Sequence, residues 1–404
     1  MKRALMLSVA AVLCAAPVVL QAQTAPAAKG AAPKAAVATK AAARAAAART
    51  FKVSYNAFGQ PDIGGMWANA TITKEVRDRA LGNQAVFTPA QVIQQEDVVT
   101  VEIAVGNRPS DPNGPPPSKG GDPLAAGIRP ELAVASGTVG GYERGWLDTG
   151  SYVMRVRGEP RTSILTTPDG QYPPRKGAVA AAGRGGGAGR GGGGGAGRGG
   201  ANAPEVLIDT PQGRVSSIPL VGGLDNPEQR TISDRCILSF GRNAGPPMLA
   251  NGYYNNNYNI VQGRDSVAIM TEMVHDVRVV RLNSKHRTDG VRPYFGDSIG
   301  HYEGDTLVVE TTNIPQTQAY AGSWQTLTVT EKFTRVDPAH LLYQYIIHDP
   351  SLWDADWGGE YEFYSLRPGQ HVEEYACHEG NYALEDILAG ARAADAAAAR
   401  TAAR

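Results

Sequence analysis

Cysteine is scarce in this sequence, and several other features that would identify a class of protein are missing. Only 3 of the 404 residues are cysteine, which excludes a small scaffold built on disulfide bonds. Hydrophobic residues make up 42% and charged residues 19%, a balance that excludes a polytopic membrane protein and a wholly disordered chain. The length permits one large domain or two ordinary ones.

The short motifs that identify many catalytic sites are also missing. The sequence has no HExxH or CxxC motif, no EF-hand loop and no Walker motif. The run from Gly183 to Gly200 contains GxGxxG, but only because it consists almost entirely of Gly, Arg and Ala. No strand pattern precedes it and no helix pattern follows, so we predict no nucleotide cofactor.

The formal net charge is zero, but the charges are unevenly distributed. Residues 1–22, 23–50 and 176–203 contain 11 of the 39 Lys and Arg residues and no acid, so the rest carries 28 bases against 39 acids. An acidic body repels phosphate backbones, and we therefore expect no nucleic-acid partner.

Residues 1–22 have the pattern of a cleaved signal peptide. Lys2 and Arg3 precede an uncharged, mainly apolar stretch, and Ala22 offers a small residue at a cleavage point. We therefore expect a periplasmic or secreted protein. Residues 23–50 are mainly Ala, Lys, Pro and Thr, which predicts a basic disordered tether that could contact the cell envelope.

Export also decides what we expect of the cysteines. Cys14 lies within the predicted signal peptide and would be removed with it. The compartment outside the cytoplasm is oxidising, and an even pair of cysteines there usually bonds. We therefore predict a disulfide between Cys236 and Cys377; two buried free thiols are the alternative.

The remaining sequence divides by composition into four parts. These are an irregular β-containing first half, a Gly/Arg-rich flexible insertion of low complexity, an antiparallel β core and an Ala-rich tail, at 51–175, 176–203, 204–390 and 391–404. The first half has too few regular apolar runs for a core of its own. We therefore expect 51–175 and 204–390 to form one unit.

The second half predicts strands in succession with no helix between them. Residues there alternate with period two, are rich in β-branched and aromatic types and are separated by turn residues. The predicted strands are 258–262, 267–271, 277–282, 306–311, 326–336, 341–348, 361–366 and 372–377. The pattern indicates a mainly β protein, an antiparallel meander closed as a lipocalin-like barrel or folded as a sandwich, with long irregular loops. Apolar residues at helical spacing after residue 381 predict a C-terminal helix.

Several long phrases resemble a large family of exported bacterial proteins of unknown function. They are PDIGGMW (61–67), DRC (234–236), EMVH (272–275), GDSIGHYEGDTLVVETTN (296–313), FTRVD (333–337) and EYACHEGNY (374–382). The resemblance spans most of 51–390. It implies membership of that family and no particular activity.

All 7 histidines lie between 275 and 378, so this region is where we look first for chemistry. His301, Glu303 and Asp305 are two residues apart and would project to one side of an extended chain. They could bind a divalent metal or transfer protons; the alternative is a structural turn at Gly304. Apart from this metal, no cofactor is predicted.

A second group of candidates surrounds His275. Glu272 and His275 flank the end of a predicted strand, and Arg278 follows closely as an anion clamp. Asp297 offers a further carboxylate to the proposed catalytic set. The alternative is that His275 only pairs with a neighbouring acid.

A third group would contact a ligand. His378 and Glu379 follow Cys377 and would be held by the disulfide, and aromatic rings could stack on sugars or aromatic ligands. The candidate ligand-binding residues are Tyr302, Glu303, His378, Glu379, Trp353 and Trp357. Packing in the core and around the disulfide is the alternative for both sets.

Three functions compete on these observations. The leading hypothesis is a periplasmic hydrolase or lyase acting on a small polar or carbohydrate-like substrate by acid–base chemistry of His and carboxylates. The alternatives are a non-catalytic β-barrel that binds a small molecule, and an interaction module of the cell envelope. The oligomeric state does not follow from the sequence.

Overall fold

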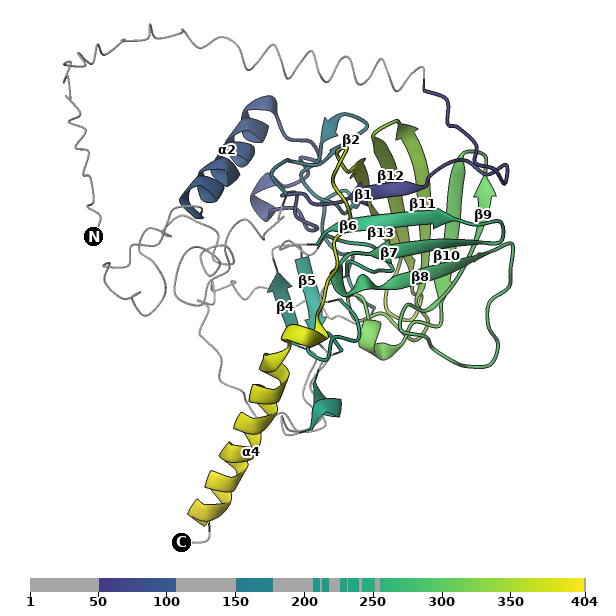
Figure 1. Cartoon of the computed structure of the whole chain (residues 1–404). Helices are drawn as coiled ribbons and strands as arrows, with labels where there is room; N and C mark the ends of the chain where they lie inside the picture. Colours follow the sequence, from purple (N-terminus) through teal and green to yellow (C-terminus); the bar gives the residue numbers. More distant parts are fainter. Residues whose placement is uncertain are drawn as a thin grey trace, which may run out of the picture. The chain divides into compact units, whose positions relative to one another are not determined.

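The computed structural model describes residues 51–106, 150–176, 226–230, 232–239, 242–250 and 255–402, and the backbone of 206–210 and 213–217. Its main feature is a closed β-barrel in the strand order β1-β13-β12-β11-β10-β9-β8-β7-β6 (Figure 1). The strands are β1 (Gly65–Ala68), β6 (Asn257–Gln262), β7 (Ser266–Thr271), β8 (Val277–Leu282), β9 (Asp297–Glu303), β10 (Thr306–Thr312), β11 (Thr328–Asp337), β12 (His340–His348) and β13 (Trp357–Ser365).

The alternation of apolar residues explains why these segments form a barrel. Along β11 and β12 every second residue faces inward, and the predicted inward residues are at most 2% exposed: Leu327, Val329, Phe333, Leu341, Tyr343, Tyr345 and Ile347. Burying one face of each strand against the others stabilises the closed sheet. The mainly β fold, its closure as a barrel and the C-terminal helix are therefore confirmed.

The first half of the chain supplies the strand that closes the barrel. β1 pairs with β6 on one side and with β13 on the other, both antiparallel. Trp67 in β1 is 1% exposed and its indole N–H donates to the carbonyl of Ile63. Four residues of β1 are thus enough to remove the free edges of a sheet built from residues after 256.

Short elements accompany the barrel. They are the strand pairs β2 (Arg155–Val156) with β3 (Glu159–Pro160) and β4 (Val206–Thr210) with β5 (Gly213–Ser217), the helices α2 (Pro89–Gly106) and α4 (Tyr382–Ala402), and the 3₁₀ turns η1 (Arg79–Leu81), η4 (Pro227–Gln229), η5 (Met273–His275), η6 (Gln316–Gln318) and η7 (His378–Gly380). None of the helices in the described ranges is long and apolar enough to cross a membrane.

One strand pair departs from the predicted antiparallel meander. β8 and β9 run parallel, with Arg281 opposite Ile299 and Leu282 opposite Gly300. A parallel pair needs a connection that carries the chain back along the sheet. The loop between residues 282 and 297 provides it, and the sequence prediction of strands missed both this return and β9.

One further predicted element was wrong, and one helix was missed. The segment 372–377 forms no strand, because side chains rather than a strand ladder hold it: the N–H of Glu373 donates to Glu272 and the carbonyl of Tyr375 contacts His275. Helix α2 was missed, because within its part described with side chains, 89–101, only Val92 and Val99, seven residues apart, bury apolar side chains.

The disulfide between Cys236 and Cys377 is confirmed, with an S–S distance of 1.99 Å and a sequence separation of 141 residues. It fastens the segment after the last strand to the segment before β6. The predicted signal peptide, the tether and all but the first residue of the Gly/Arg-rich insertion lie outside the described residues.

Candidate functional site

The structure places His301, Glu303 and Asp305 at an exposed hairpin turn. His301 and Glu303 end β9, their side chains are 53% and 57% exposed, and His301 Nε2 lies 3.0 Å from Glu303 Oε1. Asp305 instead accepts a hydrogen bond from the hydroxyl of Tyr55 at 2.8 Å. Among the described residues no three His, Cys, Asp or Glu side chains gather in a way that could hold a metal ion.

Glu272 and His275 hold the chain together near the disulfide. Glu272 is 3% exposed and accepts hydrogen bonds from Asn257 Nδ2 and from the N–H of Glu373, each at 2.8 Å. His275 is exposed, and its Nδ1 lies 3.2 Å from the carbonyl oxygen of Tyr375. These contacts pin the segment that carries Cys377, which is a structural role.

Arg278 and Asp297 are each engaged with other partners. Arg278 is buried in a two-pronged ion pair with Glu331, with one N–O distance of 2.8 Å. Asp297 accepts hydrogen bonds from Arg281, His286 and the N–H of Arg287 at 2.7, 2.9 and 2.7 Å. Burial alone would raise the pKa of Asp297, but these donors lower it below its ordinary value. The two side chains therefore do not join His275 in one site.

The predicted ligand-binding residues are also dispersed. Trp353 and Trp357 are each 4% exposed and pack edge to face, with ring centroids 5.4 Å apart. Tyr302 accepts a hydrogen bond from Gln262 Nε2 at 2.7 Å. His378 and Glu379 are exposed in η7. Core packing thus accounts for the tryptophans, as the alternative interpretation expected.

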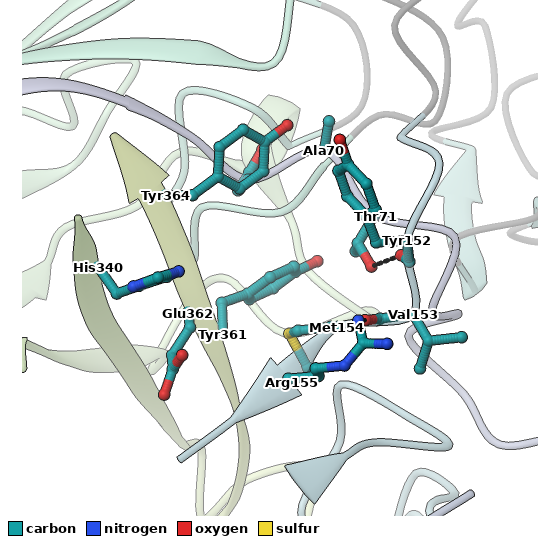
Figure 2. Close-up of a pocket in the computed structure, with 11 residues that line it drawn as sticks. Ala70, Thr71, Tyr152, Val153, Met154, Arg155, His340, Tyr361, Glu362 and Tyr364 are labelled. Carbon is teal, nitrogen blue, oxygen red and sulfur yellow. Dashed lines mark hydrogen bonds between the residues drawn. The ribbon is translucent and has the colours of Figure 1, made fainter. Parts of the chain in front are cut away.

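A pocket of about 250 Å³ opens where β1 and β13 separate. Their pairing ends at Ala68 opposite Tyr364, and the chain segments 69–71 and 152–155 form the far wall. Figure 2 shows His340 and Glu362 on one side of the pocket and Thr71 and Tyr152 on the other. The lining residues are Asn69, Ala70, Thr71, Tyr152, Val153, Met154, Arg155, His340, Tyr361, Glu362 and Tyr364.

Strand geometry brings the polar residues of this pocket together. His340 lies directly opposite Tyr364 in the β12–β13 ladder. Glu362 is two residues before Tyr364 on the same strand, so all three project from one face of the sheet. Tyr152 and Tyr364 pack edge to face with centroids 6.5 Å apart. The pocket therefore combines an imidazole, a carboxylate and aromatic rings.

Asp337 fixes the orientation of the imidazole. His340 Nδ1 lies 2.7 and 2.8 Å from the two carboxylate oxygens of Asp337, which is itself 5% exposed. To bond a carboxylate, Nδ1 must carry a hydrogen, so in the neutral ring Nε2 is the proton-accepting atom. A histidine oriented by a buried carboxylate is the usual arrangement for proton transfer.

The charged groups around the pocket are held in place by neighbours. Arg155 donates to Glu96 of α2 at 3.1 Å and to the carbonyl of Val153 at 3.0 Å. Glu362 is 7% exposed and accepts a hydrogen bond from the backbone N–H of Arg157. These contacts fix both side chains before any ligand binds.

No protein-family model, curated protein or solved structure matches this chain. The candidate site therefore depends on geometry alone.

A second polar cluster lies inside the barrel core. Glu75 is 5% exposed and accepts hydrogen bonds from the hydroxyls of Tyr172 (2.6 Å) and Tyr320. Arg242 lies over the Tyr320 ring, 4.8 Å from its centroid. Burial raises the pKa of Glu75 to about 7, although the two hydroxyls and Arg242 oppose the rise.

Sequence reasoning missed His340 and Asp337 as site residues. Both are within the segment Asp337-Pro338-Ala339-His340, whose residues separate the predicted strands 326–336 and 341–348 and have the composition of a turn. A carboxylate three residues before a histidine in such a turn is the signal that could have identified the pair. Asn69, Tyr152 and Arg155 carried no local signal, since the fold alone brings them to β13.

Proposed function

We propose that this protein is an exported hydrolase or lyase that binds a small polar, carbohydrate-like substrate in the pocket between β13 and residues 69–71 and 152–155. The observation that carries the proposal is His340 on the pocket wall, with its Nδ1 held by the carboxylate of Asp337. The pocket volume of about 250 Å³ lies below the usual range of ligand sites, about 300–1,000 Å³, so the pocket suits a small ligand.

The side chains of the pocket fit a hydroxylated ring. Tyr152, Tyr361 and Tyr364 offer aromatic faces and hydroxyl groups, which can pack against the C–H face of a sugar and bond its hydroxyls. In this proposal His340 Nε2 takes a proton from the substrate or from an attacking water. Asp337 stabilises the imidazolium that results.

The disulfide supports the proposed location outside the cytoplasm. Disulfides persist in oxidising compartments, and the Cys236–Cys377 bond is present in the fold. This agrees with the signal-peptide pattern of residues 1–22.

The test is turnover of a panel of oligosaccharides, aryl glycosides and uronate-containing glycans by the wild type and by His340→Gln. Hydrolysis would be measured as new reducing ends, and lysis as ultraviolet absorbance of a new conjugated double bond. Because positioned proton transfer contributes about 10²–10⁴-fold, we expect His340→Gln to lower kcat at least about 100-fold without changing the melting temperature.

His348→Gln is a matched control for this experiment. His348 is at the other end of β12, its Nδ1 lies 2.7 Å from Asp356, and it does not line the pocket. It should retain wild-type turnover. Equal turnover by His340→Gln and the wild type would contradict the catalytic role, and binding of a sugar without any turnover would favour the non-catalytic binding protein.

A further inference from the structure

His286 lies between two carboxylates in the loop that connects β8 to β9. Its Nδ1 is 2.9 Å from Asp297 Oδ2 at the start of β9, and its Nε2 is 3.1 Å from Glu310 Oε1 on β10. Within residues 283–290, His286 alone is not exposed. The imidazole therefore joins an otherwise exposed part of the loop to two neighbouring strands of the barrel.

Hydrogen-bond chemistry limits when both contacts of the imidazole can form. An ionised carboxylate has only acceptors, so each ring nitrogen must carry a hydrogen to bond its carboxylate. A neutral imidazole has one N–H group, and the imidazolium has two. The contacts to Asp297 and Glu310 can therefore form together only while His286 is protonated.

The two carboxylates are not equal anchors for the ring. Asp297 is 5% exposed and also accepts hydrogen bonds from Arg281 and from the backbone N–H of Arg287. The Glu310 side chain is 51% exposed, and within the described parts of the chain its carboxylate pairs only with His286. On deprotonation the remaining N–H should stay on Asp297, and the bare Nε2 would face the Glu310 oxygen, one acceptor against another.

The other charged groups around His286 come from β8 and from its own loop. They are Arg281, Lys285, Arg287 and Asp289. Arginine keeps its charge in folded proteins, and the two guanidinium groups are bound to Asp297 and Asp289 at 2.7 and 2.6 Å. Protonation of the imidazole therefore decides whether the contact to Glu310 forms.

We propose that His286 is a pH-sensitive lock that fastens the loop between β8 and β9 to the barrel. At acidic pH the imidazolium bridges Asp297 and Glu310 and holds residues 284–290 against the strands. An imidazole loses its proton between about pH 5 and 8, so over this range the contact to Glu310 breaks and the loop opens more often. This inference does not depend on the proposed catalytic activity.

The test is hydrogen exchange of the purified protein, measured by mass spectrometry at pH 5.5 and pH 8 and corrected for the effect of pH on the chemical exchange rate. For the wild type we expect peptides that cover residues 284–290 to be about 2- to 5-fold less protected at pH 8, the range that partly exposed ion pairs support.

Glu310→Gln should abolish this difference. Its amide can accept a hydrogen bond from the imidazolium and donate one to the neutral ring, so the bridge forms in both states of His286. We expect protection of residues 284–290 to change by less than about 1.5-fold between the two pH values in this variant.

His348→Gln is the matched control. His348 contacts a single carboxylate, with Nδ1 at 2.7 Å from Asp356, and a neutral ring can make that contact. This variant should keep the wild-type change in the loop. Peptides from β11 and β12 in the same samples report on global stability, which separates local opening of the loop from unfolding.

Two results would overturn the lock. One is equal protection of residues 284–290 at both pH values in the wild type, or a loss at pH 8 that β11 and β12 share in full. The other is a loss that persists in Glu310→Gln, which would show that the contact between His286 and Glu310 does not control the loop.

Discussion

Glu75 is the residue whose ionisation the fold opposes most clearly. Its carboxyl group lies among the Tyr172 and Tyr320 hydroxyls, near Tyr345, Tyr361 and Arg242, and burial raises its pKa from 4.5 to about 7. The unfolded chain loses this proton near pH 4.5 and the folded protein near pH 7. Between these values the folded state holds more protons, so rising pH favours unfolding.

We expect the free energy of unfolding to fall by roughly 3 kcal/mol between about pH 4.5 and 7 on account of Glu75, since each pKa unit corresponds to about 1.4 kcal/mol. Glu75→Gln should abolish this part of the slope and be more stable than the wild type at pH 8. Denaturant unfolding of both proteins at pH 5, 6, 7 and 8 measures how the free energy of unfolding depends on pH. Parallel curves for the two proteins would contradict the assignment.

Comparing the wild type with Glu75→Gln separates the effect of Glu75 on stability from that of a second buried acid, Asp276. Burial also raises the pKa of Asp276 to about 6, against a hydrogen bond from the N–H of Ser239. Asp276 therefore also lowers the free energy of unfolding as the pH rises from about 3.8 to 6. Because Asp276 is present in both the wild type and Glu75→Gln, its effect cancels in the difference between their stabilities.

Residue types alone were a poor guide to the site. Clustering of histidines in the second half directed attention to His275 and His301, yet both are exposed: His275 contacts the carbonyl of Tyr375 and His301 pairs with Glu303. The burial and partners of a side chain depend on the strands around it. His340 became visible as a candidate only when β12 and β13 placed it beside Glu362 and Tyr364.

At the scale of elements, strand β13 is the one on which the pocket depends. It carries Tyr361, Glu362 and Tyr364, and it packs closely on β12 at Gly358 and Gly359. A Cβ atom built on Gly358 would lie 1.9 Å from the carbonyl oxygen of Tyr345. Only glycine permits this approach of the two strands.

Gly358→Ala should therefore destabilise the protein by about 3 kcal/mol, because the added methyl group must push β12 and β13 apart. Gly380→Ala is the control, since a Cβ there would meet nothing within 4 Å, and it should change stability by less than about 1 kcal/mol. Denaturant unfolding measures both. Equal stability of Gly358→Ala and the wild type would show that the strands can separate at little cost.

Elements with a strong period were predictable and elements set by distant contacts were not. The hairpin of β11 and β12 follows from alternation and its turn residues alone. β1 is only four residues long and becomes a strand because β6 and β13 flank it. The loop that brings the chain back before β9 is held by hydrogen bonds from Arg281 and Arg287 to Asp297. No local sequence pattern predicts these hydrogen bonds.

At the scale of the whole molecule, the proposed site is assembled from parts far apart in the sequence. Residues 69–71, 152–155, 340, 361, 362 and 364 meet at one pocket because β1 closes the barrel against β13. Sequence analysis could predict the barrel, the disulfide and the helix, since each leaves a local or compositional signal. It could not predict the pocket, because its walls come together only when β1 closes the barrel against β13.

The most direct test of the central claim is a crystal structure of the protein with the sugar that binds it most tightly. The account predicts that the sugar lies between His340 and the segments 69–71 and 152–155, with a hydroxyl group within hydrogen-bond distance of His340 Nε2. A sugar bound elsewhere on the protein, with this pocket filled only by water, would contradict it.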